Sequence, residues 1–157
     1  MKKFVLFVWA MVLSYLPGVT GFIYSPRAGA SQWYDSLEKS MLTPAPWVFG
    51  VVWPILYFLL GVALYLILRD ARPTRQKLRA YIPFGINMVL NALWTYWFFG
   101  LHMPQLSLYV SMALIIVAIW LMRVFRGINR TAGNLVWPYI GWLVFAMYLN
   151  GAIVNLN

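Results

Sequence analysis

Aromatic and amide side chains are the groups in this sequence whose types and spacing suggest a binding site. Phe49, Trp53 and Tyr57 recur at i, i+4 and i+8, which places them on one face of a helix. Two further helical faces mix aromatic and amide groups, the first with Asn87, Asn91, Trp94 and Phe98 and the second with Tyr139, Trp142, Ala146 and Asn150. Because rings offer stacking surfaces and amides orient polar edges, these faces predict a cavity for a large, flat, mostly apolar molecule.

The composition indicates the environment of this cavity. Of 157 residues, 63% are hydrophobic and 10% are charged, whereas a soluble domain has about 25% charged residues. We expect an all-α integral membrane protein, because helices satisfy their own backbone hydrogen bonds in lipid and no alternating strand pattern is present. Asparagine amides are costly against lipid and should face the interior, where the alternatives are bonds between helices and bonds to a ligand.

Groups that conventional catalysis would use are scarce. The three acidic residues, Asp35, Glu38 and Asp70, all fall outside the apolar segments. They offer no carboxylate pair for acid–base hydrolysis and no intramembrane carboxylate for ion-coupled transport. His102 is the single histidine, and the lack of cysteine excludes thiolate metal sites. We expect neither a conventional catalytic set nor a metal site.

Five apolar segments, each long enough to span a bilayer, divide the chain. They predict a single domain, residues 1–157, built as a five-transmembrane-helix bundle with helices at about 4–24, 47–68, 81–101, 105–122 and 134–156 and an external loop at 25–46. The first segment also resembles a secretory signal, because Lys2 and Lys3 precede it and Ala28-Gly29-Ala30 follows it. Its 21 uncharged residues exceed the length of a signal core, so we expect it to be retained.

Basic residues are distributed unevenly among the connections. Ten of the twelve lie at the N-terminus, in 69–80 or in 123–133, whereas only Arg27 and Lys39 lie in the alternate connections. The positive-inside rule therefore places the N-terminus in the cytoplasm and the 25–46 loop and the C-terminus outside, in a bacterial inner membrane. The net charge of +9 is a topological and lipid-facing signal, and no nucleic-acid partner is expected.

Several residue blocks together resemble the TspO/MBR family, which includes the tryptophan-rich sensory proteins of bacteria and the mitochondrial translocator protein, or peripheral-type benzodiazepine receptor. The matching blocks are Trp33-Tyr34-Asp35 with Leu37 and Lys39, Trp47-Val48-Phe49 with Val52-Trp53 and Leu56-Tyr57, Leu90-Asn91 with Trp94 and Phe98-Phe99-Gly100, and Pro138-Tyr139 with Trp142, Phe145-Ala146 and Leu149-Asn150. No block is decisive alone, but their combination is specific and spans most of the chain.

The resemblance implies a bundle of five helices, commonly a homodimer, with a ligand cavity under the first loop. In the family this cavity binds porphyrins such as protoporphyrin IX and haem, benzodiazepine-type ligands and, in some members, sterols. Residues that match Trp53, Asn91, Trp142 and Ala146 line it, and some bacterial members degrade protoporphyrin in light through the two tryptophans. The family's C-terminal sterol motif is missing because no basic residue follows Tyr148, which makes sterol binding doubtful.

We therefore expect a membrane receptor or sensor that binds a porphyrin or haem as a ligand, without a resident cofactor, and influences tetrapyrrole metabolism. Two alternatives stay open: light-dependent porphyrin breakdown, with Trp53 and Trp142 as reactive rings, and transport of a porphyrin or sterol. The other expected partners are the lipid bilayer and a second copy of the chain. The expected ligand-binding residues are Tyr34, Phe49, Trp53, Tyr57, Asn87, Asn91, Trp94, Trp142, Ala146 and Asn150.

The expected orientation can be tested with a single cysteine, because the chain has none of its own. Ser36→Cys should react with a membrane-impermeant thiol reagent in intact spheroplasts, since the positive-inside rule places the 25–46 loop outside. Protection of this cysteine in intact spheroplasts would reverse the orientation.

Overall fold

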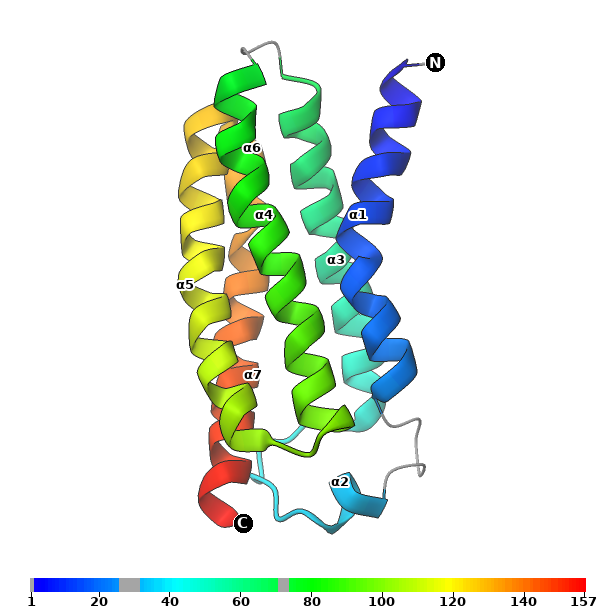
Figure 1. Ribbon diagram of the computed structural model, residues 1–157, viewed down its shortest axis with the longest axis vertical. Helices are drawn as coiled ribbons and strands as arrows, with labels where there is room; N and C mark the ends of the chain where they lie inside the picture. The colour runs from blue at the N-terminus through cyan, green and yellow to red at the C-terminus, as the bar shows by residue number, and fades with distance from the viewer. Residues whose placement is uncertain (1, 26–31, 71–73) are drawn as a thin grey trace.

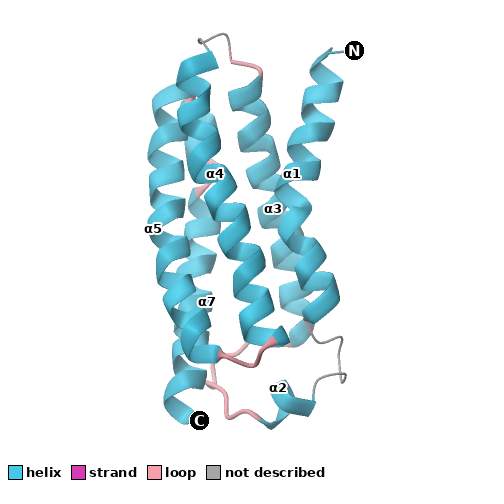
Figure 2. Cartoon of the chain, in the orientation of Figure 1, coloured by secondary structure: helices cyan, strands magenta, loops and turns pink. Residues whose placement is uncertain are grey.

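The computed structural model describes residues 2–25, 32–70 and 74–157, and no strand occurs among them. Figure 2 shows that helices account for nearly all of this part of the chain. The helices are α1 (Lys2–Tyr24), α2 (Gln32–Ser36), α3 (Pro46–Leu68), α4 (Thr74–Thr95), the π-helical segment η1 (Tyr96–Gly100), α5 (Pro104–Ile128), α6 (Arg130–Asn134) and α7 (Trp137–Leu156). The all-α expectation is confirmed.

Proline marks the start of three long helices. Pro46, Pro104 and Pro138 occupy the first or second position of α3, α5 and α7. An amide hydrogen has no helical partner at these positions, and the fixed φ of proline suits the helix. At its C-terminal end, α4 continues directly into η1. There Leu101 N–H bonds to Tyr96 O, five residues earlier, at 2.9 Å, so the turn is wider than in an α-helix.

The helices differ from the expected five in number and in bounds. Two five-residue helices, α2 inside the expected 25–46 loop and α6 ahead of α7, are too short for hydrophobic periodicity to reveal. α4 begins at Thr74 rather than near 81, and α5 continues to Ile128 rather than ending near 122. Both extensions carry basic residues, which hydropathy assigns to loops although helices accept them readily. The signal-like pattern at Ala28-Gly29-Ala30 lies outside the described residues.

Among the described residues, four segments are long and apolar enough to cross a membrane: Lys3–Tyr24, Pro46–Leu68, Pro104–Ile128 and Arg130–Leu156. α4 is not among them, because it begins with basic residues, carries buried asparagines in its middle and loses regular α-helical bonding after Thr95. The structure thus establishes an apolar helical bundle with four candidate spans. The hydropathy of α4 therefore does not support the fifth span that was expected at 81–101.

The long helices lie side by side, with α1 packed against α3 and α4, and α5 packed against α4 and α7 (Figure 1). The N-terminus, the end of α3 and α6 lie at one end of the bundle (Figure 1). We call this the basic end, since Lys3, Arg69, Arg79, Arg123, Arg126 and Arg130 belong to it. α2, the start of α5 and the C-terminus lie at the opposite end, which we call the lid end (Figure 1).

The interior changes character along the bundle. Toward the basic end it is filled by apolar side chains such as Leu60, Leu64 and Ile67, and by the Phe84 and Phe125 rings, which stack at 6.5 Å. Toward the lid end tryptophans and amides replace them. Large apolar side chains also cover the outside, most densely along α1, which suits contact with lipid. The chain is an integral membrane protein.

Gly133 is the point where α6 folds back onto α5. A Cβ atom built at Gly133 would lie 2.5 Å from Arg126 Cβ and 2.7 Å from Arg126 N. The Asn129 side chain fixes the preceding turn by accepting a hydrogen bond from Ala132 N–H at 3.0 Å. Only glycine therefore fits this crossing without movement of the backbone.

Gly133→Ala should lower the midpoint of thermal unfolding, because the added methyl group must displace backbone at a cost of about 1–3 kcal/mol. Gly141→Ala is the matched control, since its methyl group would meet nothing within 4 Å and alanine is the better helix former. Circular dichroism in detergent micelles measures both variants. If Gly133→Ala unfolds at the same temperature as Gly141→Ala, the close crossing of α5 and α6 is contradicted.

Candidate functional site

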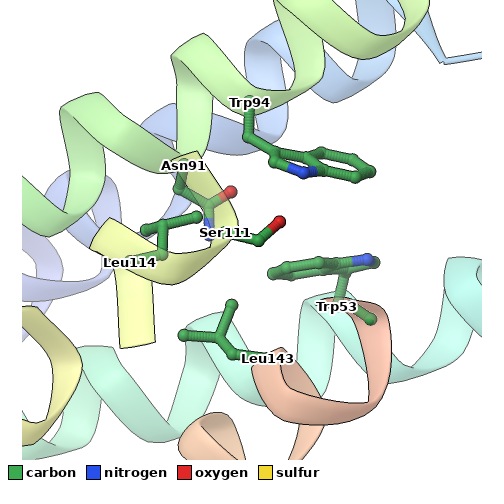
Figure 3. A pocket seen from close by; sticks show the side chains of 7 residues that line it. Trp53, Asn91, Trp94, Ser111, Leu114 and Leu143 are labelled. Atoms are coloured by element: carbon green, nitrogen blue, oxygen red, sulfur yellow. The ribbon is translucent and has the colours of Figure 1, made fainter. Parts of the chain in front are cut away.

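A small cavity lies between four helices in the lid half of the bundle. It is lined by Trp53 of α3, Asn91 and Trp94 of α4, Ser111 and Leu114 of α5, and Leu143 and Ala146 of α7. Figure 3 shows the Trp53 and Trp94 rings on opposite sides of this space, with the Ser111 hydroxyl pointing between them. The cavity has a volume of about 10 Å³, which is room for about one water molecule.

A chain of hydrogen bonds joins α3, α4 and α7 beside the cavity. Tyr57 Oη donates to Asn91 Oδ1 at 2.9 Å. Asn91 Nδ2 donates to Tyr139 Oη at 3.0 Å, and Tyr139 Oη donates to Asn87 Oδ1 at 2.8 Å. None of the four side chains is more than 6% exposed. The buried amides therefore link helices, as one of the two sequence alternatives requires, and Asn91 also faces the cavity.

Three buried N–H donors have no acceptor within the described part of the chain: Nδ2 of Asn87 and Nε1 of Trp94 and Trp142. A buried polar group without a partner costs about 1–3 kcal/mol. Trp94 lines the cavity, whereas Trp142 is not among the lining residues. The indole N–H group of Trp94 is thus available to an acceptor that a bound molecule would bring.

Aromatic side chains separate α3 from α7 along one side of the cavity. Phe49 meets Trp142 edge-on with ring centroids 5.7 Å apart, and Trp53 meets Tyr139 at 6.5 Å. The backbones of the two helices approach each other closely at few positions. We call Phe49, Trp53 and Trp142 the aromatic seam, since Tyr139 is held in the hydrogen-bond chain. Side chains rather than close backbone packing therefore join the two helices here.

Residues 32–45, which we call the lid, cover this end of the bundle and are held on the side of η1 by aromatic contacts. The Trp33 and His102 rings stack with centroids 4.1 Å apart. Tyr34 contacts the Phe98 and Phe99 rings edge-on at 6.2 and 5.5 Å. Burial and, to a lesser degree, the Asp35 carboxylate raise the pKa of Tyr34, so its hydroxyl stays protonated at neutral pH.

Hydrogen bonds hold the lid on the side of α7. Asn157 Oδ1 accepts from Glu38 N–H at 3.0 Å, and Asn157 Nδ2 donates to Glu38 O at 3.1 Å. The hydroxyls of Ser40 and Tyr148 are hydrogen-bonded at 3.1 Å. The lid is thus attached at both of its sides, and it closes the end of the bundle above the cavity.

The structure assigns nine of the ten expected site residues to four places: the cavity lining (Trp53, Asn91, Trp94, Ala146), the hydrogen-bond chain (Tyr57, Asn87), the aromatic seam (Phe49, Trp142) and the lid (Tyr34). Asn150 lies apart from them. In the orientation that satisfies its amide, Asn150 Nδ2 donates to Pro104 O at 3.1 Å and Oδ1 accepts from Leu108 N–H at 2.9 Å. This amide therefore ties α7 to the first turn of α5.

Three residues of the cavity lining are not among those expected from sequence: Ser111, Leu114 and Leu143. They carry no signal, because small and aliphatic side chains occupy cores and cavities alike. Tyr139 is on one of the faces that predict the cavity but not among the expected ligand-binding residues, and it joins the hydrogen-bond chain. Within the described ranges, no three His, Asp or Glu side chains gather as a metal site requires.

Lipid-facing helices around a lid-covered internal cavity define this chain as a polytopic membrane protein of the helical-bundle class. It belongs to the TspO/MBR family, whose sequence model matches residues 5–156. The resemblance noted in the sequence is confirmed.

Named relatives cover most of the chain. A tryptophan-rich protein TspO of Archaeoglobus fulgidus is 35% identical over 140 residues, 89% of each chain. A tryptophan-rich sensory protein of Cereibacter sphaeroides is 32% identical over 95% of this chain and 92% of its own. The human translocator protein is 31% identical over 80% of this chain and 75% of its own.

Tyr139→Phe should lower the free energy of unfolding by about 1–3 kcal/mol, because Asn91 Nδ2 and Asn87 Oδ1 would lose their partner in a buried position. Tyr109→Phe is the matched control, since Tyr109 is 59% exposed on α5 and its change should stay within about 0.5 kcal/mol. Denaturant titration in mixed micelles measures both. Equal losses in the two variants would contradict the structural role of the hydrogen-bond chain.

Proposed function

We propose that the protein is a membrane receptor or sensor that binds a porphyrin, such as protoporphyrin IX or haem, between Trp53 and Trp94 and thereby influences tetrapyrrole metabolism. Benzodiazepine-type ligands would occupy the same place. The observation that carries the proposal is the pair of indole rings on opposite sides of one cavity (Figure 3). Two flat apolar faces suit a planar conjugated ring, because aromatic groups favour stacked arrangements with one another.

The polar groups around the cavity suit the edge of such a ligand. The unpaired indole N–H group of Trp94 would donate to a carboxylate or carbonyl oxygen, and that of Trp142 would do so once the cavity widens. The Ser111 hydroxyl and the Asn91 amide add neutral polar contacts. Porphyrins combine an apolar face with carboxylates at the edge, and benzodiazepine-type molecules carry a carbonyl group, so both present acceptors. In this proposal the porphyrin is a ligand and no cofactor is resident.

Ligand binding requires the site to widen. Cavities that hold molecules of this size measure about 300–1,000 Å³, and the present one has room for about one water molecule. The aromatic seam would separate by ring rotation, and the lid would lift after loss of the Asn157 hydrogen bonds to Glu38. The structure described here then corresponds to the closed form of the site.

The proposal includes a placement in the membrane. α4 and η1 together run the length of the bundle beside α5 (Figure 1), and we take them as the fifth crossing because their amides are buried by neighbouring helices. The basic end would face the cytoplasm and the lid the outside of a bacterial inner membrane, since basic loops stay inside. A homodimer in the bilayer is part of the same proposal, and sterol binding is not.

The names of the relatives support a sensor and a translocator equally, so one experiment must separate three functions. Purified protein is titrated with protoporphyrin IX and then followed by absorbance in light and in the dark. Trp53→Phe and Trp142→Phe should each weaken binding by about two- to tenfold, because indole packing contributes about 0.5–1.5 kcal/mol. Trp120→Phe is the control, since Trp120 lies on α5 and is 43% exposed.

The receptor proposal predicts saturable binding and no protein-dependent bleaching of the porphyrin. Bleaching that disappears in both variants while binding survives would instead establish light-dependent breakdown. Saturable flux of porphyrin into liposomes that contain the protein would establish transport. Absence of binding at micromolar porphyrin, or equal weakening by Trp120→Phe, would overturn the assignment of this cavity.

A further inference from the structure

We propose that the basic end carries a binding site for an anionic phospholipid on the outer face of α5 and α6. Its headgroup would contact Arg123, Arg126 and Arg130, and its acyl chains would lie along the apolar face of α5. This inference does not depend on what the cavity binds.

Positive charge is concentrated at the basic end. Among the described residues, nine basic residues and one acidic residue, Asp70, lie toward this end, whereas Lys39, Asp35 and Glu38 lie at the lid end. Anionic headgroups attract such a cluster at short range. The partner is therefore expected to be negatively charged.

The three arginines have no partner of their own in the structure. Their side chains are exposed, and no hydrogen bond or ion pair engages them within the described part of the chain. Two other basic residues at this end differ: Arg69 lies over the Tyr65 ring at 5.6 Å, and Lys77 Nζ donates to Leu68 O at 3.2 Å. We therefore expect another molecule to supply the negative charge that balances the three arginines.

The backbone that carries the three arginines is fixed at two points. The crossing at Gly133 presses α6 against Arg126, and the Asn129 cap fixes the turn that leads into Arg130. Arg123 lies one turn before Arg126 on α5. A rigid backbone under flexible guanidinium groups lowers the entropic cost of binding.

An exposed apolar stripe runs along α5 up to Arg123 and favours a lipid over a free anion. It consists of Tyr109, Met112, Ile116 and Trp120, which are 59%, 44%, 67% and 43% exposed. Their spacing puts them and Arg123 on one helical face. Trp120 lies about 4.5 Å below Arg123 along the axis, where the amphipathic indole suits the border between acyl chains and headgroups.

The test compares two triple variants that remove the same charge from the same end. Phosphatidylglycerol is titrated onto the protein in neutral detergent, and the first bound lipid is quantified by native mass spectrometry against phosphatidylcholine. Arg123→Gln/Arg126→Gln/Arg130→Gln should weaken the first phosphatidylglycerol by at least about tenfold, since each basic residue at a membrane surface contributes about fivefold. Lys3→Gln/Arg69→Gln/Arg79→Gln should weaken it less than about threefold.

Two further measurements test whether the bound molecule is a lipid rather than a free anion. Trp120→Ala should weaken phosphatidylglycerol while leaving the charge intact, and millimolar inorganic phosphate should not displace the lipid. Circular dichroism checks that all variants keep their helix content, and unfolded variants are replaced by the single substitution Arg126→Gln. Equal losses in both triple variants, equal affinity for phosphatidylcholine, or complete displacement by phosphate would each overturn the site.

Discussion

The constraint on which this structure depends is that a bilayer supplies no hydrogen bonds to buried polar groups. Two asparagines and two tyrosines in the middle of the bundle therefore bond to one another in a chain from Tyr57 through Asn91 and Tyr139 to Asn87. Within the described residues, Asn87 Nδ2 is the one polar atom of this chain that is left without an acceptor. This chain fixes α3, α4 and α7 relative to one another. The cavity exists at that level because polar and aromatic side chains replace the close aliphatic packing found toward the basic end.

The same constraint explains why the site combines rigid and adjustable parts. The hydrogen-bond chain on one side and the Asn150 contact with α5 on another hold the helices in place. Between them, α3 and α7 meet through rings of the aromatic seam, which rotate at lower cost than backbones separate. The lid is attached by stacking of Trp33 on His102 and by the Asn157 hydrogen bonds, which are weak individually. In the proposed function, a large ligand would therefore enter without unfolding of the bundle.

Much of this arrangement was predictable, because helical spacing alone turned Trp53, Asn91 and Trp94 to the interior, and all three line the cavity. Helical spacing could not distinguish Asn91, which faces the cavity, from Asn150, which bonds to α5. Both amides are buried for the same reason, because a polar group is costly against lipid. The helices α2 and α6 could not be predicted because five residues are too few to show a hydrophobic period. The extra turns of α4 and α5 carry basic residues, which hydropathy assigns to loops. The closed state of the cavity depends on side-chain rotamers, which no sequence pattern specifies.

The most direct test of the central claim is a structure of the protein in lipid nanodiscs with protoporphyrin IX bound. The proposed function predicts the macrocycle between the Trp53 and Trp94 rings, its carboxylates within hydrogen-bonding distance of indole N–H groups, and the Tyr57–Asn91–Tyr139–Asn87 chain unchanged. A porphyrin bound on the outer face of α1 or at the basic end, with Trp53 and Trp94 as they are in the closed state, would contradict it.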